Sequence, residues 1–523
     1  MTGLIFKKSF IIQTMYKKCK MYKVNTLNKN KTLAPTVAII AFLLYLIIKN
    51  NLLIYGDEPE IAETAINMLN GYKAIFRGNL SIIEPQSYLY GSIYTYIFFA
   101  VTFPITLIRQ ILGFPVSDKN FFYLFFRVIN LGIFTLSLVY MYKILRLLEL
   151  KNRNYRLWAL FLWVINPIFI ARSQFINQDV LALSLFSISS FYYLKYLNNK
   201  EDKYIFIYFF ISGLTISAKI TYIIPLIFST FFYLYIDKKV LLKKMVFLIL
   251  PLVSYIISFP YSVVNFHRYF NRLIELKALE AGIALDSYNL NPLYYLEKNF
   301  IYLFPILIYI IYKIYKKKMK MEWNLKTIYI VGLWVSLILF FSVQIRKTDR
   351  WGMPIYFLGY ILVIYYLYKS RAKKIIYTLL QINAFILISM IFPILVFFTQ
   401  KDPRNILRKY VERNTKNTYA ILSEHGNNDE VEKNTNVSVF KHKIYENKDD
   451  LTTYFPYPEI EKYDYLIISN GAIRDFYNRY SLSKYKGIRS WNNYINNLTK
   501  VDSVGSNKIR YEPEIGFTIY KVN

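Results

Sequence analysis

Long apolar runs, separated by short polar segments, fill most of the first 400 residues. They cover residues 33–49, 88–113, 121–146, 155–172, 178–197, 203–218, 219–236, 243–262, 299–316, 326–344, 350–369 and 374–399. Most are close to the roughly 20 residues that a helix needs to cross a bilayer. Because lipid offers backbone groups no hydrogen bonds, each run must be helical. The pattern predicts an α-helical polytopic membrane protein.

Basic clusters between the runs predict the orientation, because Lys and Arg favour cytoplasmic loops. The clusters lie at 17–23, 146–156, 195–203, 237–244, 316–326 and 369–374. The loops at 171–178, 263–298 and 344–350 then lie outside, as does everything after residue 400. A crossing by 88–113 would reverse this order. We therefore expect that run, which contains Pro104 and Arg109, to lie in the interface. Eleven spans follow, with the N-terminus inside and the C-terminus outside.

Three regions follow from this reading. Residues 1–32 form a basic cytoplasmic tail, residues 33–400 form the membrane domain with a first outer loop at about 50–120, and residues 401–523 form a soluble domain. The last region is rich in Asn, Asp, Glu and Lys. Within it, "YAILSEHG" (419–426) and "YDYLIISNG" (463–471) indicate strands. We expect a small extracytoplasmic α/β domain.

Composition supports the membrane class and narrows the chemistry. The chain is 55% hydrophobic and 19% charged, with a net charge of +32 and a mean hydropathy of +0.26. Its basic residues form short clusters between apolar runs rather than one stripe, which argues against a nucleic-acid partner. Cys19 is the only cysteine, so no intrachain disulfide can form. The three histidines are too scattered for a His-based metal site.

The first candidate site is the acidic pair Asp57-Glu58, directly after the first span. Acidic residues near a helix start stabilise the helix dipole, and Pro59 fits a first helical position. The functional alternative is a base or metal ligand, because adjacent like charges raise one pKa and favour a carboxylate that accepts a proton. Both interpretations stay open for the pair.

Three further polar positions lie at outer span ends, where charge is costly and tends to mark function. Asp179 opens a span and is either an N-cap or a functional carboxylate. Lys219 lies between two apolar runs and either snorkels or binds an anion. "QIRKTDRWGMP" (344–354) is a basic outer loop. Its cations can hold a phosphate or pyrophosphate, unless they are simply solvated; they are Arg346, Lys347 and Arg350.

Carboxylates and cations together on one membrane face suit sugar transfer from a lipid-phosphate donor. A carboxylate takes the acceptor's proton, and Arg and Lys stabilise the departing phosphate. The donor's polyprenyl chain stays in the bilayer, so the reaction needs a membrane-embedded cleft.

The ordered set of motifs resembles the GT-C fold lipid-phosphate-sugar glycosyltransferases. These include glycosyltransferase family 39, with the protein O-mannosyltransferases, and the bacterial aminoarabinose transferases. The matching segments within residues 33–400 are "YGDEPEIAETAINMLNGY", "SQFINQDVLALSLF", "GLTISAKITYIIPL", "SFPYSVVNFHRYFNRL" and "RKTDRWGMPIYF". The resemblance implies eleven spans with juxtamembrane helices in the first outer loop.

The resemblance also implies roles for single residues. Asp57 is the catalytic base with Glu58 beside it, and the basic positions Lys219, Arg346, Lys347 and Arg350 bind the donor phosphate. Further substrate-binding or metal candidates are Asp179, Tyr88 and Trp351. Two departures are that Pro85 stands alone where the family has a Pro-Pro pair, and that Trp351 replaces the usual Tyr.

The expected function is inverting transfer of a sugar from a polyprenyl- or dolichyl-phosphate donor. The acceptor is a lipid, a glycan or a protein on the outer face of the plasma membrane. Cofactors stay open, with a divalent metal near Asp57 and Asp179 as the one candidate. The alternatives are a transporter or lipid flippase, or a non-catalytic subunit of a surface-polysaccharide assembly system. Internal repeats, which favour a transporter, are not evident in the sequence.

Overall fold

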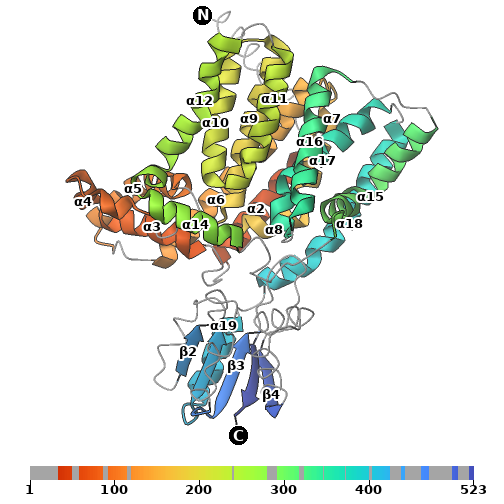
Figure 1. Cartoon of the computed structure of the whole chain (residues 1–523). Coiled ribbons are helices and arrows are strands. Elements are labelled where there is room, and N and C mark those ends of the chain that lie inside the picture. Colours follow the sequence, from red (N-terminus) through yellow and green to blue (C-terminus); the bar gives the residue numbers. More distant parts are fainter. Residues whose placement is uncertain are drawn as a thin grey trace, which may run out of the picture.

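The protein is an upright bundle of helices with a small β-sheet domain beyond one end, as the computed structural model shows (Figure 1). The structure describes residues 33–49, 58–85, 92–114, 119–237, 241–278, 291–316, 323–344, 347–370, 373–399, 403–423, 437–441, 461–469, 497–504 and 517–522. The expected cytoplasmic tail at 1–32 lies outside these residues.

The bundle helices follow the apolar runs. They are α2 (Leu33–Lys49), α6 (Lys119–Leu147), α7 (Arg153–Val164), α8 (Pro167–Ser173), α9 (Gln178–Asn199), α10 (Asp202–Ala218), α11 (Ile223–Ile236), α12 (Leu241–Ser258), α15 (Tyr294–Tyr315), α16 (Leu325–Val343), α17 (Met353–Lys369) and α18 (Lys373–Thr399). By length and composition, seven described helices can cross a membrane, or eight when the bent pair α7 and α8 counts as one. The expected polytopic helical fold is confirmed.

The apolar run at 155–172 is divided into two helices. Helices α7 and α8 meet at an angle of 60°. Pro167 starts α8 and cannot donate the hydrogen bond that would continue α7. Asn166 caps the new helix by accepting a bond from the Ile168 backbone N–H (2.9 Å), and its amide donates to the Tyr360 hydroxyl (3.2 Å). Hydrogen bonds of Asn166 with α8 and with Tyr360 therefore fix the bend.

Short helices crowd one end of the bundle. In the first outer loop they are α3 (Glu58–Asn70), α4 (Tyr72–Phe76), η1 (Leu80–Ile83) and α5 (Ile93–Ile111). The second loop contributes α13 (Tyr261–Val264) and α14 (Phe266–Ala278). Glu84 joins the two loops by accepting bonds from Asn265 (2.8 Å) and Arg268 (2.9 Å). Figure 1 shows α3, α4, α5 and α14 together near the end that faces the sheet domain.

Helix α5 is long and apolar enough to be a span, yet both of its ends contact elements of this same end of the bundle. Near its start, the Tyr94 hydroxyl donates to Asn130 of α6, whose amide donates to the backbone oxygen of Arg172 (3.3 Å). Near its end, Gln110 accepts from the Tyr72 hydroxyl of α4 (3.1 Å). These contacts favour the expected interfacial position of α5.

Loops expected on the cytoplasmic side meet at the opposite end. Lys326 Nζ contacts the backbone oxygen of Leu147 (2.9 Å), the Glu149 carboxylate (3.2 Å) and the Asn198 side chain (3.1 Å). These contacts bring three of the basic clusters, 146–156, 195–203 and 316–326, together at one end of the bundle.

The last domain contains α19 (Pro403–Arg413) and one five-stranded mixed sheet. Its strands are β1 (Tyr419–Ser423), β2 (Val437–Lys441), β3 (Tyr465–Ser469), β4 (Thr499–Val504) and β5 (Phe517–Lys521), in the order β2-β1-β3-β5-β4. β1 pairs in parallel with β2 and β3, whereas β5 is antiparallel to β3 and β4. Leu407 and Val411 of α19 form a core with sheet residues. Both expected strands are present, as β1 and β3.

Candidate active site

The candidate site begins with a buried carboxylate on α9 and a lysine at a helix break. Asn177 is the N-cap of α9 and accepts a bond from the Asp179 backbone N–H (2.8 Å), so the N-cap interpretation of Asp179 is wrong. The Asp179 carboxylate instead accepts from Lys219 Nζ. Lys219 separates α10 from η2 (Ile220–Tyr222) in an extended conformation. The Asp179 and Lys219 side chains are only 4% and 13% exposed.

A short turn before α17 completes this group. The 3-10 helix η5 (Asp349–Gly352) places Arg350 Nε 3.9 Å from the second carboxylate oxygen of Asp179. The next residue, Trp351, lies with its ring centroid 5.6 Å from Lys219 Nζ, within the range of a cation–π contact. Three segments that the sequence singles out separately therefore meet at one point.

The start of α15 holds η5 from the other side. Lys298 Nζ lies 3.1 Å from one carboxylate oxygen of Asp349, and the Tyr294 hydroxyl donates to the other (2.7 Å). The Tyr295 hydroxyl donates to the backbone oxygen of Thr348 (3.3 Å). Sequence reasoning missed Lys298, although a lysine directly before an apolar run is a visible signal.

Lys347 adds another cation close to this turn. Its side chain is buried, and Nζ donates to the backbone oxygen of Gln344 (2.5 Å). Burial lowers the pKa of Lys347, because desolvation disfavours the charged form.

The described residues of this cluster carry charges of both signs. They are four cations, Lys219, Lys298, Lys347 and Arg350, and two carboxylates, Asp179 and Asp349. Lys and Arg side chains held close together in partly desolvated surroundings suit an anion such as a phosphate group.

Glu58 has a different environment from the carboxylates of the cation cluster. It is fully buried and accepts two bonds from Arg127, at 2.8 Å from Nε and 2.6 Å from Nη2. It also accepts from the Ile176 backbone N–H (2.8 Å), in the loop just before Asp179. Glu58 thus ties the start of α3 to α6 and to the loop that leads into α9. Sequence reasoning missed Arg127, a charge inside the apolar run "FFYLFFRVINLG".

Three expected site residues, Asp57, Tyr88 and Arg346, lie outside the described residues. Within the part of the chain that the structure describes, no three His, Cys, Asp or Glu side chains gather as metal ligands. Asp179 has cations as its charged neighbours, so its described surroundings fit an anion better than a divalent metal.

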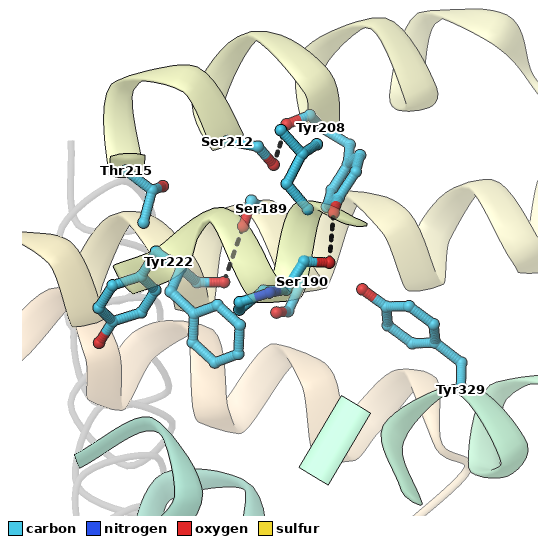
Figure 2. A pocket seen from close by; sticks show the side chains of 10 residues that line it. Ser189, Ser190, Tyr208, Ser212, Thr215, Tyr222 and Tyr329 are labelled. Carbon is cyan, nitrogen blue, oxygen red and sulfur yellow. Dashed lines mark hydrogen bonds between the residues drawn. The ribbon is translucent and has the colours of Figure 1, made fainter. Parts of the chain in front are cut away.

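A small cavity lies among α9, α10, α11 and α16, with hydroxyl groups around it (Figure 2). Its volume is about 10 Å³, enough for roughly one water molecule. Among the hydroxyls that line it, Ser190 Oγ is buried and makes no hydrogen bond within the described residues. The cavity is too small for a sugar or a phosphate, so it is not the substrate site.

Comparison with known proteins gives a structural match only. No protein-family model matches the chain, and no curated protein sequence does. Apo ArnT from Cupriavidus metallidurans is similar in structure, with a TM-score of 0.50 at 10% identity, covering 94% of this chain and 98% of that one. The same ArnT bound to undecaprenyl phosphate gives 0.48 at 9% identity with the same coverage. The oligosaccharyltransferase of Archaeoglobus fulgidus gives 0.44 at 12% identity, covering 84% of this chain and 69% of that one.

The chain has a GT-C-type fold. The match to apo ArnT extends over nearly the whole of both chains, so the small sheet domain is included in the aligned length. In this GT-C fold, the Asp179, Lys219 and Arg350 contacts join the start of α9 and the end of α10 to η5, directly before α17.

Proposed function

We propose that this protein is an integral membrane glycosyltransferase. It transfers one sugar, with inversion, from a polyprenyl- or dolichyl-phosphate donor to a lipid, glycan or protein acceptor on the outer face. The contact of Asp179 with Lys219 and Arg350 is the main support. It gathers charge from separate loops at one end of a bundle with a GT-C-type fold.

In this proposal the cation cluster binds the donor phosphate. Lys219 and Arg350 approach it from different elements, and Asp179 holds both side chains in place before the donor arrives. Lys347 adds charge just before η5, and Arg346, the preceding residue in the sequence, is expected to do the same. The positively charged Lys and Arg side chains stabilise the negative charge that grows on the departing phosphate, which lowers the free-energy barrier to sugar transfer. The ring of Trp351 lies within cation–π range of Lys219 and helps to hold its ammonium group.

Asp57 is the proposed general base. The acceptor's oxygen attacks the anomeric carbon while its proton moves to the Asp57 carboxylate. The bond from that carbon to the phosphate oxygen breaks, and its electron pair stays on the phosphate. Attack from the face opposite the phosphate inverts the anomeric configuration. Glu58 fixes the start of α3 through Arg127, and Asp57 directly precedes Glu58 in the sequence.

The same proposal sets the orientation in the membrane. The end of the bundle that carries Asp179 and Lys219 faces outside, and the end that carries Lys326 faces the cytoplasm. The excess of Lys and Arg in the loops of the latter end supports this orientation. The N-terminus is then inside, and the sheet domain is outside.

The proposal is tested by mass spectrometry of lipid-linked sugars and surface glycans in a deletion strain. We expect one polyprenyl-phosphate sugar to accumulate and one surface glycan to lose that sugar. Wild-type protein should reverse both changes, whereas Asp57→Asn, which cannot accept the proton, should reverse neither. Membrane insertion of the variant is checked by immunoblotting of the membrane fraction.

Two outcomes would contradict the proposal. Unchanged profiles of lipid-linked sugars and surface glycans in the deletion strain would contradict the transferase function. Full rescue by Asp57→Asn would remove the catalytic-base role, and would favour a transporter or a non-catalytic subunit.

A further inference from the structure

Asp349 is the second carboxylate of the cation cluster, and contacts hold both of its oxygens. Its two oxygens bind different groups, Lys298 at 3.1 Å and the Tyr294 hydroxyl at 2.7 Å. The side chains of Lys298 and Asp349 are 13% and 9% exposed, so solvent and salt screen this ion pair only weakly. The contact joins the first turn of α15 to η5, more than 50 residues later in the chain.

The turn that Asp349 begins carries Arg350 and Trp351. A 3-10 helix of four residues has poor intrinsic hydrogen-bond geometry, so its position depends on contacts made by its side chains. Arg350 reaches Asp179 at 3.9 Å, which is longer than a direct hydrogen bond. A small displacement of η5 would therefore separate Arg350 from Asp179 and Trp351 from Lys219.

We propose that Asp349 is a positioning residue for donor binding. Through Lys298 and Tyr294 it fixes η5 on α15, so that Arg350 is oriented toward the anionic phosphate of the donor. The identity of the ligand rests on the proposed function, whereas the positioning of η5 rests on the contacts alone. Asp349 itself carries a negative charge and is already bound, so it does not contact the phosphate.

The test measures the affinity of purified protein in nanodiscs for polyprenyl phosphate without a sugar. Asp349→Asn keeps the shape of the side chain and removes its charge. We expect about tenfold weaker binding, the effect of one misplaced charge-assisted hydrogen bond. Tyr294→Phe, which removes only the hydroxyl, should weaken binding less. Arg350→Gln should weaken it at least as much as Asp349→Asn.

A double-mutant cycle separates positioning from a general loss of structure. If Asp349 acts through Arg350, Asp349→Asn should have no further effect in the Arg350→Gln background. The matched control is Lys326→Met. Lys326 is 12% exposed and also forms an ion pair, with Glu149, but at the opposite end of the bundle. Its loss should leave the affinity within about twofold of wild type, since it is remote from the cluster.

A second measurement reports directly on the position of η5. The 19F spectrum of protein containing 5-fluorotryptophan, with the Trp351 signal assigned by its loss in Trp351→Phe, should shift in Asp349→Asn and stay unchanged in Lys326→Met. An unchanged Trp351 signal, unchanged affinity in Asp349→Asn, or additive effects in the cycle would each overturn the positioning role. If wild-type protein fails to bind polyprenyl phosphate while the Trp351 signal still shifts, the proposed function is overturned and the positioning role stands.

Discussion

At the scale of single residues, the buried pair of Glu58 and Arg127 separates a structural carboxylate from a catalytic one. The two side chains are 1% and 5% exposed, and the Ile176 N–H also donates to Glu58. In the sequence, Asp57 and Glu58 form one acidic pair, and either residue could stabilise the helix start or act as a base or metal ligand. The contacts of Glu58 support a structural role, so the catalytic hypothesis now falls mainly on Asp57.

Loss of Arg127 should destabilise the fold strongly. Arg127→Met leaves the Glu58 charge buried without its guanidinium, and breaking such a buried pair costs about 3–5 kcal/mol. We expect thermal unfolding of the detergent-solubilised protein at a clearly lower temperature. Glu58→Leu combined with Arg127→Met removes both charges and should recover most of the loss.

The control is Lys119→Met, which breaks the pair of Lys119 and Glu63. Their side chains are 59% and 31% exposed, and exposed pairs contribute about 0–1 kcal/mol. Equal shifts in the unfolding temperature for Arg127→Met and Lys119→Met would contradict the structural role of the Glu58 pair.

Residue types could be predicted at the site, but their pairing could not. Asp179, Lys219 and Arg350 stand out in the sequence because charge at a span end is costly, and the structure brings the three together. The contact of Lys298 with Asp349 depends on how α15 packs beside η5. No local pattern encodes that packing, since the two residues are far apart in the chain.

At the scale of elements, the apolar runs predict where helices lie, and the deviations have local causes. The break at Asn166–Pro167 divides the run at 155–172 and follows from the chemistry of proline, whereas the separation of α10 from α11 at Lys219 agrees with the predicted runs. The amphipathic helix α14 was not predicted. Its polar face, with Arg268 bound to Glu84, interrupts the apolar signal that marks spans.

Helix α5 gives the element-scale prediction, because its length alone would allow a crossing. If it lies in the interface, the residues before and after it share one side of the membrane. We expect single cysteines from Asn79→Cys and Phe114→Cys, in a Cys19→Ser background, both to react with a membrane-impermeant maleimide in intact cells.

The comparison position is Asn198→Cys, at the opposite end of the bundle, which should react only after the membrane is permeabilised. Reaction of position 79 but not of position 114 in intact cells would mean that α5 crosses the membrane. The eleven-span arrangement would then be wrong.

At the scale of the whole molecule, the side of the membrane on which each loop lies connects the fold to the proposed chemistry. The charge pattern divides the loops into two groups, because membrane proteins concentrate basic loops on one side. Side-chain contacts join members of one group, such as Lys326 and Glu149, and members of the other, such as Lys219 and Asp179. The sugar and the acceptor are not encoded in such statistics, because they depend on the shape of the cleft.

The most direct measurement is the release of free polyprenyl phosphate by purified protein in lipid vesicles. The substrates are the lipid-linked sugar that accumulates in the deletion strain and the envelope fraction of that strain as acceptor. We expect wild-type protein to release polyprenyl phosphate and to transfer the sugar in equal amounts. Asp57→Asn should be slower by at least about a hundredfold, the range of general-base catalysis. No release by folded wild-type protein, or equal release by Asp57→Asn, would contradict the account.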